Sequence, residues 1–174
     1  GTDMGARLVD LNGDGLTDLF YAQDQGEQAA YLNTGNGWRR ETAWNFGPFQ
    51  GMIFADSPGQ DQGWRLVDVN ADGLVDLIRA IANQPFRALL NTGSGWTTTD
   101  STRFLPERAM VTNGGQDFGD RLADINGDGL TDIVHGNPNY VDYAELWTST
   151  AQTLPATPPD LLTRVENGLG GTVG

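Results

Sequence analysis

The stretch Asp10-Leu-Asn-Gly-Asp-Gly-Leu-Thr-Asp18 indicates how this chain folds, because it occurs three times. It returns as Asp68-Val-Asn-Ala-Asp-Gly-Leu-Val-Asp76 and again as Asp124-Ile-Asn-Gly-Asp-Gly-Leu-Thr-Asp132. The three loops start 58 and then 56 residues apart. Regular spacing of this kind is typical of tandem structural repeats, in which each repeat forms one supersecondary unit.

The similarity extends on both sides of the loops. Each loop follows a Gly-x-Asp-x-Gly-x-Arg-Leu segment, and the first loop is followed by Leu32-Asn-Thr-Gly-Asn-Gly-Trp38, which returns as Leu90-Asn-Thr-Gly-Ser-Gly-Trp96. In the third unit the second half has diverged, and Glu145-Leu-Trp147 stands where Tyr31-Leu-Asn33 is expected. We therefore divide the chain into repeats 1–58, 59–114 and 115–150, followed by a Pro-rich linker and C-terminal tail at 151–174.

Within each repeat the residue pattern predicts β-structure. Short runs of β-branched, aliphatic and aromatic residues flank the loops, and Gly and Asn mark the turns between them. In the first repeat we expect strands over 7–9, 19–22, 29–32 and 38–44. Four short strands in about 57 residues is the size of a propeller blade. The predicted fold is therefore all-β, with three four-stranded antiparallel blades that form part of a larger propeller.

Oxygen-bearing side chains recur at positions 1, 3, 5 and 9 of each loop, a pattern that predicts a calcium site. Position 7 would contribute a backbone carbonyl, and the invariant glycine at position 6 allows the chain to turn sharply around an ion. With water these groups supply six or seven hard oxygen ligands, which suits Ca²⁺ better than Mg²⁺. The predicted ligands are Asp10, Asn12, Asp14, Leu16 and Asp18; Asp68, Asn70, Asp72, Leu74 and Asp76; and Asp124, Asn126, Asp128, Leu130 and Asp132.

The helical proteins that share this loop opening do not fit. An EF-hand requires an acidic residue at position 12, where this chain has Tyr21, Arg79 and His135. The alternative without metal is a set of solvated acidic turns, but three copies with every side-chain ligand retained favour calcium. We expect about three Ca²⁺ ions per chain, which would take the formal charge from −13 to −7. Folding and metal binding should then be coupled.

Composition narrows the function classes. The 23 acidic residues and net charge of −13 make nucleic acid an unfavourable partner. The chain has no cysteine, which excludes disulfides and thiol catalysis. No apolar run is long enough for a membrane helix, so we expect no membrane insertion.

The segment Arg7-Leu-Val-Asp-Leu-Asn-Gly-Asp-Gly-Leu-Thr-Asp18 resembles the FG-GAP/VCBS repeats of integrin-α-like β-propellers. The resemblance implies a Ca²⁺ ion in the hairpin loop between the first two strands of each blade. More narrowly, the Leu-Asn-Thr-Gly-x-Gly-Trp segments and the tail Pro159-Asp-Leu-Leu-Thr-Arg-Val-Glu-Asn-Gly-Leu-Gly-Gly171 resemble RHS and insecticidal toxin-complex B-subunit-type proteins. The resemblance implies a propeller piece that helps to form a toxin shell or its docking surface.

We expect a non-enzymatic structural and protein-interaction module of a secreted or cell-surface protein. His135, the only histidine, is expected to be structural. The partner would be the rest of a larger propeller or another chain. Carbohydrate binding is the alternative, since five tryptophans could stack on sugars. Repeated Trp38 and Trp96 are expected in blade packing, whereas Trp64, unmatched in the other repeats, is the better candidate for an exposed contact.

Overall fold

The chain folds as successive antiparallel sheets. The computed structural model describes residues 3–23, 28–44, 53–56, 59–104, 108–136, 144–147, 165–166 and 172–173. Among these residues the one helical element is a single 3₁₀ turn, η1 (Ser101–Arg103), and every other element is a strand. No described helix has the length and apolar character needed to cross a membrane.

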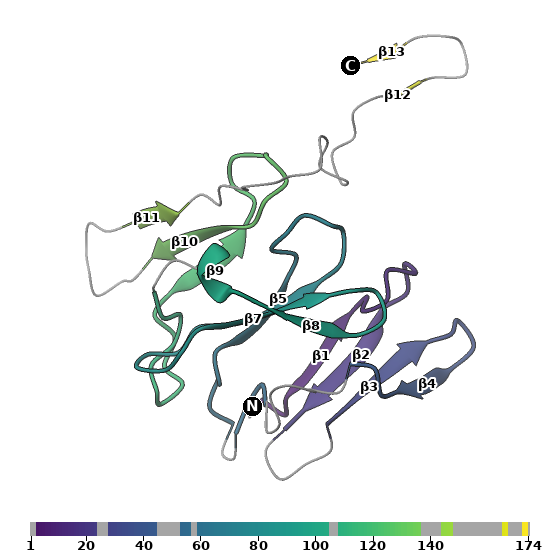
Figure 1. The fold of residues 1–174 in the computed structure, drawn as a ribbon, viewed down its shortest axis with the longest axis horizontal. Helices are drawn as coiled ribbons and strands as arrows, with labels where there is room; N and C mark the ends of the chain where they lie inside the picture. The colour runs from purple at the N-terminus through teal and green to yellow at the C-terminus, as the bar shows by residue number, and fades with distance from the viewer. Residues whose placement is uncertain are drawn as a thin grey trace.

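Each sheet is a simple meander whose strands pair in chain order (Figure 1). The first sheet contains β1 (Ala6–Val9), β2 (Asp18–Ala22), β3 (Gln28–Asn33) and β4 (Trp38–Glu41). The second contains β5 (Trp64–Val67), β6 (Asp76–Arg79), β7 (Arg87–Asn91) and β8 (Trp96–Thr99). The third contains β9 (Asp120–Ala123), β10 (Asp132–Gly136) and β11 (Ala144–Trp147). β12 (Val165–Glu166) pairs with β13 (Thr172–Val173). The predicted all-β fold with four-stranded antiparallel blades is confirmed.

The register of the third sheet differs from the sequence alignment. Trp147 pairs with Ile133 in the way that Tyr31 pairs with Leu19. Trp147, rather than Glu145, therefore occupies the place of Tyr31. The reason is the connection before β11, which is two residues longer than the one before β3 and shifts the strand along its partner.

The three blades pack face to face through two apolar clusters. Blade 1 contributes Phe20, Ala22 and Leu32 to the first cluster, and blade 2 contributes Trp64 and Leu77. The ring of Phe20 also lies 5.9 Å from that of Trp96 in blade 2. The second cluster joins the opposite face of blade 2 to blade 3, through Val69, Ile78, Ala80, Ala88, Met110 and Ile133. Each inner blade therefore buries both of its faces.

The connections between blades also repeat. The amide of Phe54 donates to the carbonyl of Ala22 at 3.0 Å, and the amide of Met110 donates to the carbonyl of Ala80 at 3.0 Å. In both cases the connecting segment adds a short bridge between one blade and the first strand of the next. The fixed repeat length reflects this shared connection.

Two tryptophan predictions were wrong. Trp64 is 5% exposed and packs in the interface between blades 1 and 2, with the Arg79 guanidinium 5.7 Å from its ring centroid. Trp38, expected in blade packing, is 55% exposed. The prediction is confirmed for Trp96, whose Nε1 donates to the carbonyl of Trp44 at 3.2 Å beside the core.

Candidate calcium-binding loops

The carboxylate at position 1 organises each acidic loop. In the first loop, Asp10 Oδ1 accepts a hydrogen bond from the amide of Gly13 at 2.8 Å, and Oδ2 accepts one from Gly15 at 2.7 Å. Asp68 and Asp124 accept the equivalent pairs of amides in the other loops. These bonds fix the direction of the carboxylate, much as outer hydrogen bonds orient metal-binding carboxylates in general.

Positions 3 and 5 are tied together in the same way. Asn12 Nδ2 donates to Asp14 Oδ2 at 2.9 Å, and Asn12 Oδ1 accepts from the amide of Asp14 at 3.0 Å. Asp14 Oδ1 accepts from the amide of Leu16 at 2.8 Å. The second and third loops contain the same bonds, through Asn70, Asp72, Asn126 and Asp128. The loop backbone thus has one conformation in all three repeats.

The carboxylate at position 9 lies deeper, at the start of the second strand of its blade. Asp18 is fully buried, and its two oxygens accept hydrogen bonds from the amides of Leu11 at 2.9 Å and Asn33 at 2.8 Å. Asp76 makes the equivalent bonds to Val69 and Asn91. This residue therefore joins the loop to the far end of the third strand, a structural role that the sequence analysis did not predict.

Positive φ angles explain the small residues at positions 4 and 6. Gly15 and Gly73 at position 6 both have φ of 84°, as the predicted sharp turn requires. At position 4, Ala71 has φ of 57°, the left-handed region that Gly13 also occupies at 75°. The alanine there shows that glycine is replaceable, at a cost of about 1–2 kcal/mol in backbone strain.

The second loop has raised carboxylate pKa values. Burial raises the pKa of Asp76 from 3.8 to about 7, although hydrogen bonds from Asn91 and Val69 oppose the shift. The charges of Asp72 and Asp68 add to the increase. Burial, together with the charge of Asp72, also raises the pKa of Asp68. The three carboxylates lie close enough to repel one another, so a cation in the loop would relieve an unfavourable arrangement.

The donor set of each loop fits a hard cation in kind. Three carboxylates, an amide oxygen and a backbone carbonyl are the ligand types that Ca²⁺ prefers. In the described part of the chain, however, no three acidic or histidine side chains are gathered as closely as around a bound ion. Binding would therefore require the carboxylates at positions 1, 5 and 9 to close on the ion. The fifteen predicted ligands stay a prediction.

The loops of neighbouring blades touch one another. A Cβ added to Gly13 would lie 2.9 Å from Leu74 Cδ2, so the position-7 side chain of the second loop packs on position 4 of the first. Leu130 is 3% exposed, whereas Leu16 is 37% exposed. Thr131 Oγ1 donates to the carbonyl of Asp68 at 2.7 Å, which joins the third loop to the second. The candidate metal sites are thus part of the interfaces between blades.

An Asp-x-Gly-x-Arg motif before each first strand went unrecognised as a structural device. Asp61 Oδ1 accepts a hydrogen bond from the amide of Gly63 at 2.8 Å, and Asp61 Oδ2 pairs with Arg65 at 2.7 Å. Asp3 with Arg7, and Asp117 with Arg121, repeat both contacts. The motif was visible in the repeat alignment, where the three residues recur at the same offsets.

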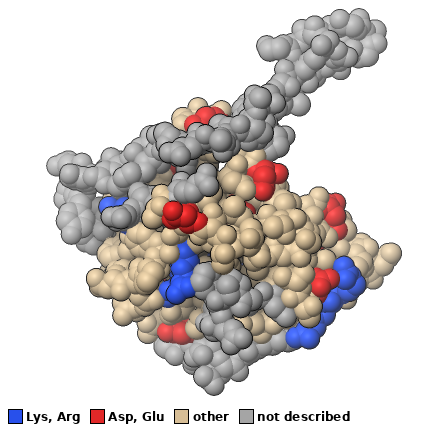
Figure 2. Space-filling view, in the orientation of Figure 1, with Lys and Arg blue, Asp and Glu red and all other residues tan. Residues whose placement is uncertain are grey.

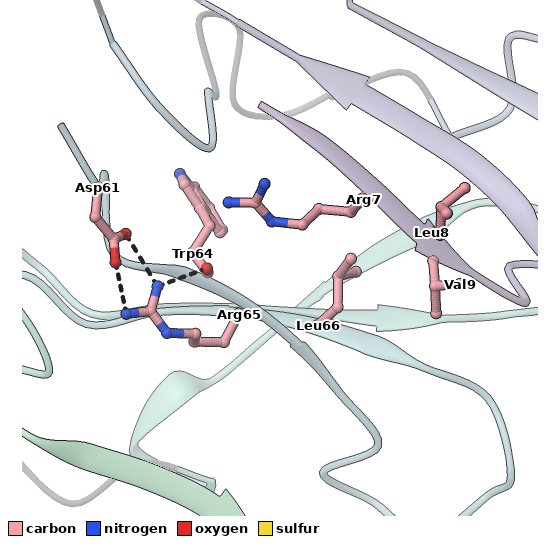
Figure 3. A pocket seen from close by; sticks show the side chains of 7 residues that line it. All are labelled: Arg7, Leu8, Val9, Asp61, Trp64, Arg65 and Leu66. Carbon is pink, nitrogen blue, oxygen red and sulfur yellow. Dashed lines mark hydrogen bonds and ion pairs between the residues drawn. The ribbon is translucent and has the colours of Figure 1, made fainter. Parts of the chain in front are cut away.

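These pairs line a groove of about 430 Å³ between β1 and β5 (Figure 3). Its wall contains Arg7 from the first blade and Trp64 and Arg65 from the second. The hydrogen bond from Arg7 lowers the pKa of Asp3, and the charge of Arg65 in the next blade acts in the same direction. The groove is therefore flanked by ion pairs that already have their partners.

His135 lies inside the protein and has a structural partner. It is 5% exposed, and its Nδ1 lies 2.9 Å from Asp120 Oδ1 on the adjacent strand. Arg108 Nε donates to the same oxygen at 3.2 Å. Trp64 and Arg79 form the corresponding cross-strand pair in blade 2. One cross-strand position thus holds a complementary pair in both blades.

Charged side chains are dispersed over the surface. On the face in Figure 2, acidic side chains form separate patches, with basic side chains between them. The face shows no continuous basic surface of the kind that binds nucleic acid.

Comparison with known protein families gives two matches. Residues 10–58 match the model of the FG-GAP-like repeat, and residues 91–174 match the model of the insecticide toxin TcdB middle/N-terminal region. No curated protein matches the chain. The first match covers the first acidic loop and the rest of blade 1, and the second covers blade 3 and the C-terminal tail. The resemblance drawn from the sequence, to FG-GAP repeats and to toxin-complex B-subunits, is confirmed.

Proposed function

We propose that this chain, which combines an FG-GAP-like repeat with a toxin-associated region, is a calcium-stabilised scaffold of propeller blades that mediates protein interaction. The observation that carries the proposal is the repetition of one hydrogen-bond network in all three loops. Each network directs carboxylates into a short loop whose glycine allows a tight turn around an ion. About three Ca²⁺ ions would bind per chain.

The contacts between loops explain why calcium would stabilise a scaffold. Leu74 packs over the first loop, and Asn91 Nδ2 donates to the carbonyl of Leu11 in that loop at 2.7 Å. An ion that holds the first loop therefore also holds a surface on which blade 2 rests. Ion binding at one loop would in this way favour the docking of the next blade.

The setting that we propose is an exported protein of a toxin-associated assembly. Loops of this type in extracellular modules bind Ca²⁺ with dissociation constants of about 10⁻⁴–10⁻³ M, which millimolar calcium fills. The partner would be the remainder of a larger propeller or another protein chain. We propose no catalytic role, because the one histidine of the chain is buried in a pair with Asp120.

Thermal unfolding in a few millimolar Ca²⁺, in excess EGTA and in Mg²⁺ tests the proposal. We expect a large rise in melting temperature with Ca²⁺ alone, and about three ions per chain by calorimetric titration. Asp14→Asn keeps the shape of an exposed ligand and removes its charge, so it should lose one site without changing the melting temperature in EGTA. An equal response to Mg²⁺, or none to Ca²⁺, would overturn the metal role.

The alternative, carbohydrate binding, has one observation in its favour. Trp38 is 55% exposed, and exposed aromatic rings can stack on sugars. A glycan array with the intact chain and with Trp38→Ala tests it. Binding that disappears in the variant would support a lectin-like role.

A further inference from the structure

Blade 1 exposes an apolar sheet face. Leu8 on β1 is 70% exposed and Trp38 on β4 is 55% exposed, while Leu19 and Tyr31 between them are half-buried. The strand register places these four side chains on one side of the sheet. We call Leu8, Leu19, Tyr31 and Trp38 the outer face of blade 1.

The same face of blade 2 is covered. Leu66, Leu77, Leu89 and Trp96 occupy the equivalent positions, in the same strand register. All four belong to or pack against the cluster that joins blades 1 and 2, and Leu77 and Leu89 are fully buried. The outer face of blade 1 therefore has the composition of a surface that another blade covers in this protein.

The covering surface has a defined chemistry. Against blade 2, blade 1 presents Phe20, Leu11 and Leu32 with the small residues Ala22 and Ala30. The small residues leave room for large side chains such as Trp96, and Phe20 packs beside its ring at 5.9 Å. A blade of the same repeat offers this combination of one aromatic, two aliphatic and two small side chains.

Polar contacts independently indicate the same occupant. Asn91 bonds to the carbonyl of Leu11 in the preceding loop, whereas the described contacts give the equivalent Asn33 side chain a single hydrogen bond, from the amide of Gly35. Leu74 packs on Gly13 of the preceding loop, whereas Leu16 is 37% exposed. A preceding acidic loop would provide both the carbonyl and the apolar contact.

We propose that the outer face of blade 1 docks a further blade of the same repeat, in the register that joins blade 1 to blade 2. This inference deepens the proposed scaffold function, because it names the partner chemistry of one surface. The bound blade would place a carbonyl next to Asn33 and an aromatic ring next to Trp38.

A tandem fusion tests the proposal. A second copy of residues 1–58 placed directly before Gly1 recreates the 58-residue spacing of the first two loops. Since the chain has no cysteine, Leu8→Cys introduces one thiol whose reaction rate with a disulfide reagent reports its exposure. In the fusion, Leu8→Cys of the original blade should react at least about tenfold more slowly than in the unfused chain. Leu66→Cys in the unfused chain gives the rate of a covered position.

The added copy provides the matched control. Leu8→Cys in that copy should react as fast as in the unfused chain, because no blade precedes it. Equal rates at the two positions would overturn the proposal. An increased rate for Leu66→Cys in the fusion would overturn it too, since a fitting blade should not loosen the blades beside it. Slow, concentration-dependent labelling of the unfused chain would assign the face to a second copy instead.

Measurements in Ca²⁺ and in EGTA separate this proposal from the proposed function. If the original Leu8→Cys is protected while Ca²⁺ does not raise the melting temperature, the calcium role fails and the docking surface stands. If Ca²⁺ stabilises the chain while both thiols stay equally reactive, the docking surface fails and the calcium role stands.

Discussion

Asn91 links the first two blades, and its removal tests their interface. Its Nδ2 donates to the carbonyl of Leu11 in blade 1 at 2.7 Å and to that of Val75 at 3.1 Å. Its Oδ1 accepts from the amide of Gly93 at 2.9 Å and from Trp44 Nε1 at 3.3 Å. Asn91 is 3% exposed, so water cannot easily replace these bonds.

Asn91→Ala would leave the carbonyl of Leu11 and the indole nitrogen of Trp44 without partners in a dry interface. A buried polar group left unsatisfied costs about 1–3 kcal/mol, so two such groups should lower the free energy of unfolding by about 4 kcal/mol. Urea denaturation followed by tryptophan fluorescence in constant Ca²⁺ measures this loss. The melting temperature should fall in parallel.

Asn33→Ala is the matched control, because Asn33 occupies the same turn position in blade 1. The structure gives its side chain one hydrogen bond, from the amide of Gly35 at 2.9 Å in an exposed turn. We expect a loss of about 1 kcal/mol, typical of one net hydrogen bond. If both variants lose the same stability, Asn91 does not link the blades and the reasoning is refuted.

Three further predictions concern buried charge and backbone conformation. In EGTA, the free energy of unfolding should fall as pH rises from about 4 to about 7, because burial raises the pKa of Asp76 to about 7 and the folded state binds this proton more tightly than the unfolded chain. Urea titrations across this range should lose that slope in Asp76→Asn, and an unchanged slope would contradict the assignment. Gly5→Ala should destabilise by about 3 kcal/mol or more in urea, since its Cβ would clash with a backbone carbonyl oxygen, whereas Gly15→Ala, with open space around it, should cost about 1 kcal/mol; equal losses would argue against the clash. His135→Ala should cost about 3 kcal/mol because it removes a partner of the buried Asp120 carboxylate, and His135→Gln, which keeps a donor, should cost less in the same assay; the reverse order would show that packing dominates.

The interface position of the acidic loops has a consequence for assembly. The third loop has no described blade beyond it, and Ile125 is 54% exposed, whereas Leu11 and Val69 at the same position are 0% and 7% exposed. The first two loops are held by the blade that follows each of them. Stability in this protein should therefore depend on how many neighbouring blades are in place, as in other repeat proteins.

The sequence alone determined the features that depend on short-range geometry. Positive φ at position 6 requires glycine, as in Gly15 and Gly73, and residue alternation set the core strands of each sheet. The repeat itself was readable because the loop uses the same oxygen-bearing side chains each time. Such features follow from residues a few positions apart, which fix the local backbone.

Only the tertiary structure decided which side chains are covered. Trp38 and Trp96 share one repeat position, yet Trp38 is exposed and Trp96 packs against Phe20 of the preceding blade. Asn33 and Asn91 likewise sit in identical turns, and only Asn91 reaches a carbonyl of another blade. Burial depends on neighbours that are distant in the sequence, so identical local segments acquire different roles according to whether another blade packs against them.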